Sequence, residues 1–190
     1  MKNNFNIIIT GVGGQGIITL LSVINEAAFI EGYDVKSSEL HGLSQRGGSV
    51  IAHIRFGKKV YSPMVSQGEA DLIIGLEMLE VLRSFIFTSD KTMFLINRYS
   101  LPFIGTLPEK EILEGIKKVS GDNLSLVPAS EICKKELGKE VVSGIYLLGC
   151  AAYKNLIPLK PESFLKAAEN IIPKKHLELN KKAFNLAKNA

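Results

Sequence analysis

The chain carries near its start the stretch Ile7-Ile8-Ile9-Thr10-Gly11-Val12-Gly13-Gly14-Gln15-Gly16, an apolar run that leads directly into a glycine-rich loop. The spacing of Gly11, Gly13 and Gly16 matches the G-x-G-x-x-G pattern of dinucleotide-binding turns. We expect Gly11 to allow the tight turn and Gly16 to allow close packing of the next helix. Gly13 and Gly14 should let backbone N–H groups approach a ligand. Because a helix start carries unpaired N–H groups and partial positive charge, this loop predicts an anion site.

The residues around the loop supply the strand–helix–strand context that the pattern needs. Residues 5–10 are typical of a buried parallel strand, and apolar side chains recur at helical spacing from Ile17 to Ala28. Gly32 marks the helix end, and Tyr33–Leu40 is predicted to be the second strand. The alternative to a ligand site is a tight turn whose glycines serve packing alone, but four glycines in six residues are more than such a turn needs.

Composition limits the class of protein. A chain of 190 residues is long enough for one domain, here residues 1–190, with a core of its own. The two cysteines, Cys133 and Cys150, form no C-x-x-C pair, so we expect neither a disulfide scaffold nor a metal centre, and a reducing cytoplasm fits best.

We expect no membrane span, since no apolar run approaches 20 residues. The net charge of +4 lies mainly in a lysine-rich end without interleaved aromatics, so nucleic-acid binding is not expected.

Strand and helix patterns alternate along most of the remaining chain. They predict an α/β, Rossmann-like fold: a mostly parallel sheet flanked by helices, with an inserted β-hairpin and a helical C-terminal part. The hairpin is expected to join strand 49–56 to residues 59–61, and the first of these strands to be half-buried. The apolar side of the last helix needs a surface to cover. The other expected strands are 70–75, 92–97 and 124–127, and the other expected helices are 77–87, 108–119, 130–137, 141–155, 161–171 and 174–188.

A second glycine-rich polar loop follows the second predicted strand. It reads Ser44-Gln45-Arg46-Gly47-Gly48, in which glycine N–H groups beside a guanidinium suit a phosphate or a carboxylate. A flexible approach to the hairpin, with one exposed arginine, is the alternative. Because both loops follow parallel strands, they should lie together at the carboxyl edge of the sheet, where they could face one ligand or one partner.

Residues that could carry catalysis are few. Glu39 ends the second predicted strand, where an acid can accept the ribose hydroxyls of NAD, yet it could equally be a surface carboxylate. His41 and His53 could act as general bases, but neither has a partner at a motif spacing. We find no G-x-S-x-G elbow, Walker lysine or nucleophilic cysteine, and Gly121-Asp122-Asn123 begins a thiamine diphosphate signature that is not completed. The sequence therefore predicts a nucleotide-type site without catalytic residues of its own.

Several motifs together resemble one family. In order, the glycine loop, the stretch Glu39–Val50, the tripeptide Tyr61-Ser62-Pro63 and the stretch Gly68–Glu77 are similar to the gamma subunit or domain of 2-oxoacid:ferredoxin oxidoreductases. The ending Leu177–Phe184 is most similar to the indolepyruvate members of that family. The resemblance covers nearly the whole chain, and the paired loops are more specific together than either is alone.

The resemblance implies a cytoplasmic, multisubunit enzyme that oxidatively decarboxylates a 2-oxoacid, here indolepyruvate or another arylpyruvate, to acyl-CoA and passes electrons to ferredoxin. Thiamine diphosphate, magnesium and 4Fe-4S clusters are then expected in a larger partner subunit, and this chain alone is expected to be inactive. The same resemblance implies a contact with coenzyme A. The residues implied to approach that ligand are Gly11, Gly13, Gly14, Gln15, Gly16, Gln45, Arg46, Gly47 and Gly48.

Two other classes of function stay open. A free-standing NAD(P)-dependent oxidoreductase could use the same loop, although it would need a catalytic constellation that the sequence lacks. A nucleotide-sensing module is the other possibility, and the apolar side of the last helix argues for a partner instead. Within the family, 2-oxoglutarate, pyruvate and 2-oxoisovalerate are alternative substrates, since no residue pattern here selects one of them.

Overall fold

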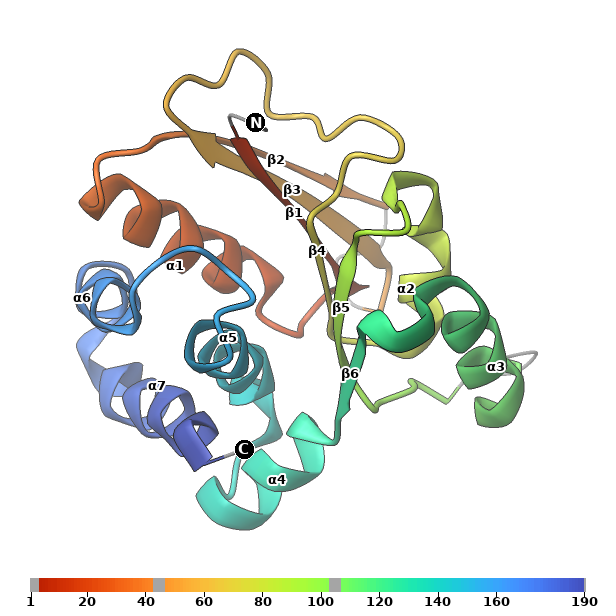
Figure 1. The fold of residues 1–190 in the computed structure, drawn as a ribbon. Coiled ribbons are helices and arrows are strands. Elements are labelled where there is room, and N and C mark those ends of the chain that lie inside the picture. Colours follow the sequence, from red (N-terminus) through yellow and green to blue (C-terminus); the bar gives the residue numbers. More distant parts are fainter. Residues whose placement is uncertain (1–3, 43–46, 103–106, 190) are drawn as a thin grey trace.

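The computed structural model describes residues 4–42, 47–102 and 107–189. In it, six strands form one sheet in the order β2-β3-β1-β4-β5-β6, with helices on both faces (Figure 1). The strands are β1 Asn4–Val12, β2 Asp34–His41, β3 Ser49–Gly57, β4 Leu72–Gly75, β5 Met93–Asn97 and β6 Leu124–Val127. The α-helices are α1 Ile17–Ile30, α2 Met78–Arg83, α3 Glu109–Ser120, α4 Ala129–Leu137, α5 Ser143–Tyr153, α6 Pro161–Ile171 and α7 Lys174–Leu186, and the 3₁₀ turns are η1 Phe85–Phe87, η2 Gly121–Asn123, η3 Glu140–Val142 and η4 Ala187–Asn189.

The sheet is mixed. β1, β4, β5 and β6 run parallel, whereas β3 is antiparallel to both of its neighbours, β1 and β2. The predicted hairpin between strand 49–56 and residues 59–61 is therefore wrong: the hairpin is β2–β3. Since both edges of β3 are already paired, a further strand has no edge to join, and the N–H of Val60 instead donates to the Asp34 carboxylate at 2.8 Å.

Two apolar layers cover the sheet. Ile7 and Ile9 point to the face under α1, α5, α6 and α7, while Ile8 between them points to the face under α2 and α3 (Figure 1). The same alternation in β3 buries Val50, Ala52, Ile54 and Phe56, while Ser49, Ile51 and Arg55 on the other face are only partly buried, which confirms the half-buried strand. His53 is the exception on that second face, because it is buried completely.

The predicted helices are confirmed within a few residues, with one exception. The helix expected over 77–87 ends at Arg83 and continues as the 3₁₀ turn η1, because Ser84 donates from both its N–H and its hydroxyl to the Val81 carbonyl. The last helix, α7, packs its apolar side on α5 and α6, where Phe184 contacts Tyr153 of α5 and Phe164 of α6. That apolar side is thus covered within the chain and gives no argument for a partner. Within the described ranges, no helix is long and apolar enough to cross a membrane.

Candidate functional site

The two glycine-rich loops meet at the carboxyl edge of the sheet, as predicted. The N–H of Gly13 donates to the carbonyl of Gly48 at 2.8 Å, and the N–H of Gly47 donates back to the carbonyl of Gly13 at 3.2 Å. We call residues 13–16 and 47–48 the paired loops. The predicted site residues Gln45 and Arg46 lie outside the described residues.

The glycines of the first loop divide their roles differently from the prediction. A Cβ on Gly11 would lie 2.5 Å from the Gln15 amide oxygen and 3.0 Å from Leu76 Cβ, so Gly11 is required by close packing. Gly14 and Gly16 have φ values of +101° and +78°, so they provide the turn. The expected assignment of the turn to Gly11 and of close packing to Gly16 is therefore wrong.

Gln15 holds the loop to the sheet. Its side-chain oxygen accepts from the N–H of Val12 at 2.9 Å, and its side-chain nitrogen donates to the carbonyl of Leu76 at 3.2 Å. The same carbonyl accepts from the buried amide of Asn97 at 3.2 Å. Gln15 thus ties the end of β1 to the ends of β4 and β5. A contact between Gln15 and a ligand remains a prediction.

The paired loops open into a depression of about 500 Å³ on the side of β2. Gly16 is the residue before the first turn of the 14-residue helix α1, and having no side chain it leaves the N–H groups of that turn without a side-chain cap. This is the geometry that suits an anion. The lining residues are Val12, Gly13, Gly14, Gly16, Ile17, Ile18, Glu39, His41 and Val50.

Glu39 and His41 line the same depression as the first loop. They lie farther from that loop than the end of the second strand does in the usual dinucleotide-binding fold. Glu39 pairs with Ala52 of β3, and β3 lies between β2 and β1. The inserted strand moves the carboxylate away from the loop by one strand spacing, about 4.8 Å. A ribose role for Glu39 is therefore less well supported by the geometry than by the sequence.

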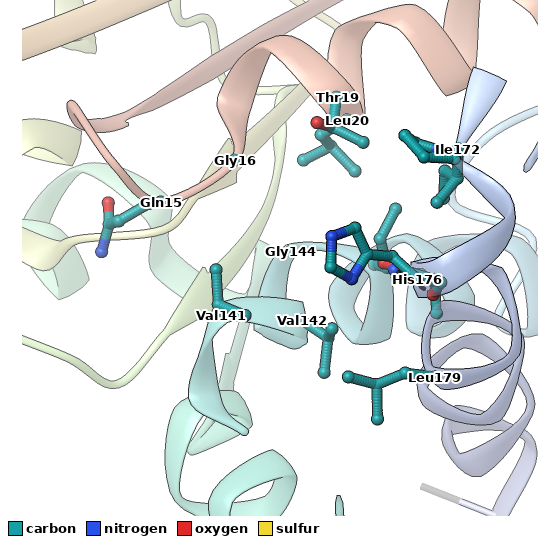
Figure 2. A pocket seen from close by; sticks show the side chains of 13 residues that line it. Gln15, Gly16, Thr19, Leu20, Val141, Val142, Gly144, Ile172, His176 and Leu179 are labelled. Atoms are coloured by element: carbon teal, nitrogen blue, oxygen red, sulfur yellow. Dashed lines mark hydrogen bonds between the residues drawn. The ribbon is translucent and has the colours of Figure 1, made fainter.

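A second cavity, of about 350 Å³, lies on the opposite side of the loop (Figure 2). The beginnings of α1, α5 and α7 converge on it, and the ring of His176 projects toward its middle, between Leu20 and Val142 (Figure 2). Its walls are mainly apolar. The lining residues are Gln15, Gly16, Thr19, Leu20, Val141, Val142, Gly144, Ile145, Ile172, Pro173, His176, Leu179 and Asn180. Sequence reasoning missed this cavity because its walls come from distant segments.

Two buried carboxylates under the paired loops were also missed. Glu77 and Glu80 are 3% and 5% exposed. Glu77 accepts from the N–H groups of Glu80 and Leu101, and burial raises the pKa of its carboxyl group above the usual range. Glu80 accepts from the hydroxyl of Ser49. The signal in the sequence was two acids within an otherwise apolar segment, directly after strand β4.

The remaining candidates lie away from the paired loops. His53 is buried among apolar groups on the face under α2, and burial lowers the pKa of its ring. Cys133 and Cys150 are buried in the helical layer, and burial raises the pKa of the Cys133 thiol to about 11. A thiol with such a pKa stays protonated at neutral pH, so neither His53 nor a cysteine thiolate faces the paired loops.

Ligand sets for two of the cofactors that the resemblance implies can be looked for directly. Over residues 4–42, 47–102 and 107–189, no group of three or more His, Cys, Asp or Glu side chains could hold a metal ion. An iron–sulfur cluster needs several thiolates, whereas the two cysteines here are buried and burial raises the pKa of both thiols. The described residues therefore offer no ligand set for a metal ion or an iron–sulfur cluster.

The fold and the paired loops define an α/β protein with a nucleotide-type glycine loop at its sheet edge. A family model described as pyruvate ferredoxin/flavodoxin oxidoreductase matches residues 6–190. The chain is 35% identical over 188 residues to the indolepyruvate oxidoreductase subunit IorB of Pyrococcus horikoshii, spanning 96% of this chain and 93% of that protein. The chain therefore belongs to the pyruvate ferredoxin/flavodoxin oxidoreductase family.

Solved structures share the fold. The pyruvate oxidoreductase subunit PORC of Thermotoga maritima is similar with a TM-score of 0.72 and 20% identity, over 99% of this chain and 97% of that one. The 2-oxoglutarate:ferredoxin oxidoreductase of Magnetococcus marinus, solved with 2-oxoglutarate, coenzyme A and succinyl-CoA, gives a TM-score of 0.76 at 17% identity. All of this chain matches 31% of that longer chain, so the same fold there is one part of a larger polypeptide.

Proposed function

We propose that this chain is the non-autonomous subunit of a thiamine-diphosphate-dependent 2-oxoacid:ferredoxin oxidoreductase that acts on indolepyruvate or a similar arylpyruvate. The family membership supports an oxidoreductase subunit, and the 35% identity to an indolepyruvate oxidoreductase subunit over nearly the whole length favours the aromatic substrate. The reaction is the oxidative decarboxylation of the 2-oxoacid to an acyl-CoA, with ferredoxin as the electron acceptor.

One observation carries the proposal: the paired loops build a backbone site for an anion, while the described residues around them include no cysteine nucleophile and no metal ligand set. Gly13 and Gly47 are bonded to one another, and the exposed side of the loop faces the depression beside β2. We infer that the paired loops contact a phosphate of coenzyme A and that the bond-breaking steps belong to a partner. The solved 2-oxoglutarate enzyme with coenzyme A bound supports this assignment of the ligand.

The partner is a larger subunit that carries thiamine diphosphate, magnesium and the clusters, and through it the chain works with ferredoxin. We expect the complex in the cytoplasm. The match to 31% of the Magnetococcus chain supports a partner of that kind, because in that chain the same fold occurs together with a larger part of the polypeptide.

The test is reconstitution. Three preparations are compared: the chain alone, the larger partner alone, and the two expressed together. For each, the 2-oxoacid-dependent reduction of viologen is measured with and without coenzyme A. We expect turnover only from the pair, with indolepyruvate or phenylpyruvate preferred over pyruvate and 2-oxoglutarate. Full activity of the partner alone contradicts the subunit role, and equal turnover of all four acids contradicts the substrate assignment.

A free-standing NAD(P)-dependent oxidoreductase is the second candidate, because Glu39 and the glycine loop line the same depression. It predicts that NADH binds the isolated chain and that Glu39→Ala removes this binding. Calorimetric titration of the isolated chain with NADH, and then with coenzyme A, separates the two functions.

A further inference from the structure

Glu80 lies at the point where the strands that feed the paired loops come together. It projects from α2, and its side chain is buried at the carboxyl edge of the sheet. One carboxylate oxygen accepts from the Ser49 hydroxyl at 2.5 Å, and the other lies 3.3 Å from Arg83 Nη1. The backbone carbonyl of Glu80 accepts from the Thr10 hydroxyl at 3.1 Å.

These contacts reach both loops. Thr10 stands in β1 directly before Gly11, and Ser49 is the first residue of β3, directly after Gly48. The two loops are also joined through the backbone of Gly13 and through the pairing of β1 with β3, which extends to Val12 and Ser49. One residue of α2 therefore holds the entry to the first loop and the exit of the second loop against the same rigid support.

The charge of the buried carboxylate is balanced by a positive charge from the solvent side. Arg83 supplies a positive charge from the last turn of α2, with its side chain 56% exposed, so the guanidinium reaches the buried acid from the solvent side. Glu77 fixes the start of the same helix by accepting from the N–H of Glu80 at 2.8 Å. A buried carboxylate that makes charge-assisted bonds holds its partners in one geometry more firmly than a neutral group does.

We propose that Glu80 is a positioning residue that sets the spacing of the paired loops and thereby their affinity for coenzyme A. The inference rests on the proposed function for the identity of the ligand. Glu80 itself contacts the loops' supports and takes no part in the chemical steps.

The experiment compares Glu80→Ala, Glu80→Gln and Ser49→Ala in the complex with the larger subunit and in the full chain. In the full chain, hydrogen exchange of the peptides that contain residues 12–14 and 47–50 is measured by mass spectrometry. In the complex, the KM for coenzyme A, the KM for the 2-oxoacid and kcat are measured separately. Glu114→Gln is the matched control, because Glu114 forms an exposed i,i+4 ion pair with Lys110 on the neighbouring helix.

We expect Glu80→Ala and Ser49→Ala to speed exchange in the peptides of the paired loops, while peptides of β4 and β5 stay protected. The KM for coenzyme A should rise about five- to tenfold, the amount expected when one hydrogen bond of typical net strength is lost. The KM for the 2-oxoacid and kcat should change less than about twofold. The double variant Ser49→Ala/Glu80→Ala should have the same KM for coenzyme A as Glu80→Ala, because both single changes remove the same hydrogen bond. Glu80→Gln, whose amide oxygen still accepts from Ser49, should lie between the wild type and Glu80→Ala.

Two results overturn the proposal: unchanged exchange of the loop peptides in Glu80→Ala, or equal rises in KM for coenzyme A and for the 2-oxoacid. If Glu80→Ala does not fold, Ser49→Ala and Glu80→Gln give the same decision. Failure of the proposed function is a different result, namely a wild-type complex without activity that depends on coenzyme A, and the exchange data then still show whether Glu80 holds the loops.

Discussion

The N–H of Val65 donates to Nδ1 of His53 across 3.2 Å, and this bond fixes the form of a fully buried histidine. An Nδ1 that accepts a hydrogen bond carries no proton, so the proton of the neutral ring is on Nε2. Nε2 is buried and lacks a hydrogen-bond partner in the described part of the chain, and the ring meets Phe87 edge-on with centroids 5.0 Å apart. The segment after β3 is thus held to the sheet by a ring that must stay neutral.

This arrangement predicts an acid-sensitive stability. Burial lowers the pKa of His53 in the folded state below the ordinary value of 6.5, so the unfolded chain takes up the proton first as the pH falls. The free energy of unfolding should therefore not depend on the ionisation of His53 above about pH 7.5. It should fall below pH 6.5, by up to about 1.4 kcal/mol per pH unit, until the folded-state pKa is reached.

Urea unfolding between pH 5 and pH 8 measures this dependence, with His53→Asn as the comparison. The asparagine oxygen can still accept from the N–H of Val65, but the side chain does not titrate. The variant should be less stable than the wild type at pH 8 and should show a flatter pH dependence below pH 6.5. Parallel curves for the two proteins would contradict a buried, neutral His53.

Gly149 should be intolerant of any side chain. A Cβ at this position of α5 would lie 2.4 Å from the Phe184 carbonyl oxygen and 2.8 Å from Ala187 Cβ, so alanine must push α7 away. We expect Gly149→Ala to lower the free energy of unfolding by about 1–3 kcal/mol, measured by urea titration. Gly144→Ala, in the same helix, is the control: its nearest neighbour is 3.5 Å away, and this change should be neutral or slightly stabilising.

Gln15 should contribute to stability through its two bonds within the loop. Gln15→Ala removes the acceptor for the N–H of Val12 and one of the two donors to the Leu76 carbonyl. The expected loss is about 1–3 kcal/mol in the free energy of unfolding, because the N–H is left unpaired in a partly buried place. Gln15→Glu keeps the acceptor but places a carboxylate oxygen against the Leu76 carbonyl, so it should also lose stability. Unchanged stability of Gln15→Ala would show that the two bonds do not hold the loop.

The sequence predicted the strands, most helix bounds and the meeting of the two loops, because hydrophobic periodicity and glycine positions are local signals. It did not predict that β3 enters between β1 and β2, since pairing depends on which strand edges are free and not on the residues of one strand. The same limit explains the role of Gly11: its crowding comes from Leu76, which is distant in the sequence, and from the Gln15 amide, which bonds to the Leu76 carbonyl.

The two loops of the candidate site could be predicted from the sequence, but the residues that hold them could not. Glycines at the start of a helix are a local signal, whereas the role of Glu80 depends on how α2 packs against Ser49. Buried acids in apolar segments are the sequence signal for such supports, although the partner that satisfies them cannot be read from one chain position.

The role of the glycine loop in ligand approach can be separated from its role in folding by comparing two glycines. Gly14 and Gly32 have φ values of +101° and +81°, and a Cβ at either would meet nothing within 4 Å. Alanine should therefore cost similar backbone strain at both, about 1–2 kcal/mol in the free energy of unfolding. Gly14 lines the depression beside β2, whereas Gly32 follows the other end of α1. In the complex with the larger subunit, Gly14→Ala should raise the KM for coenzyme A by about tenfold or more, since the methyl group keeps a phosphate from the backbone N–H groups. Gly32→Ala should leave that KM unchanged at the same loss of stability. Equal KM values for the two variants would mean that the loop serves the fold or an interface and not the ligand.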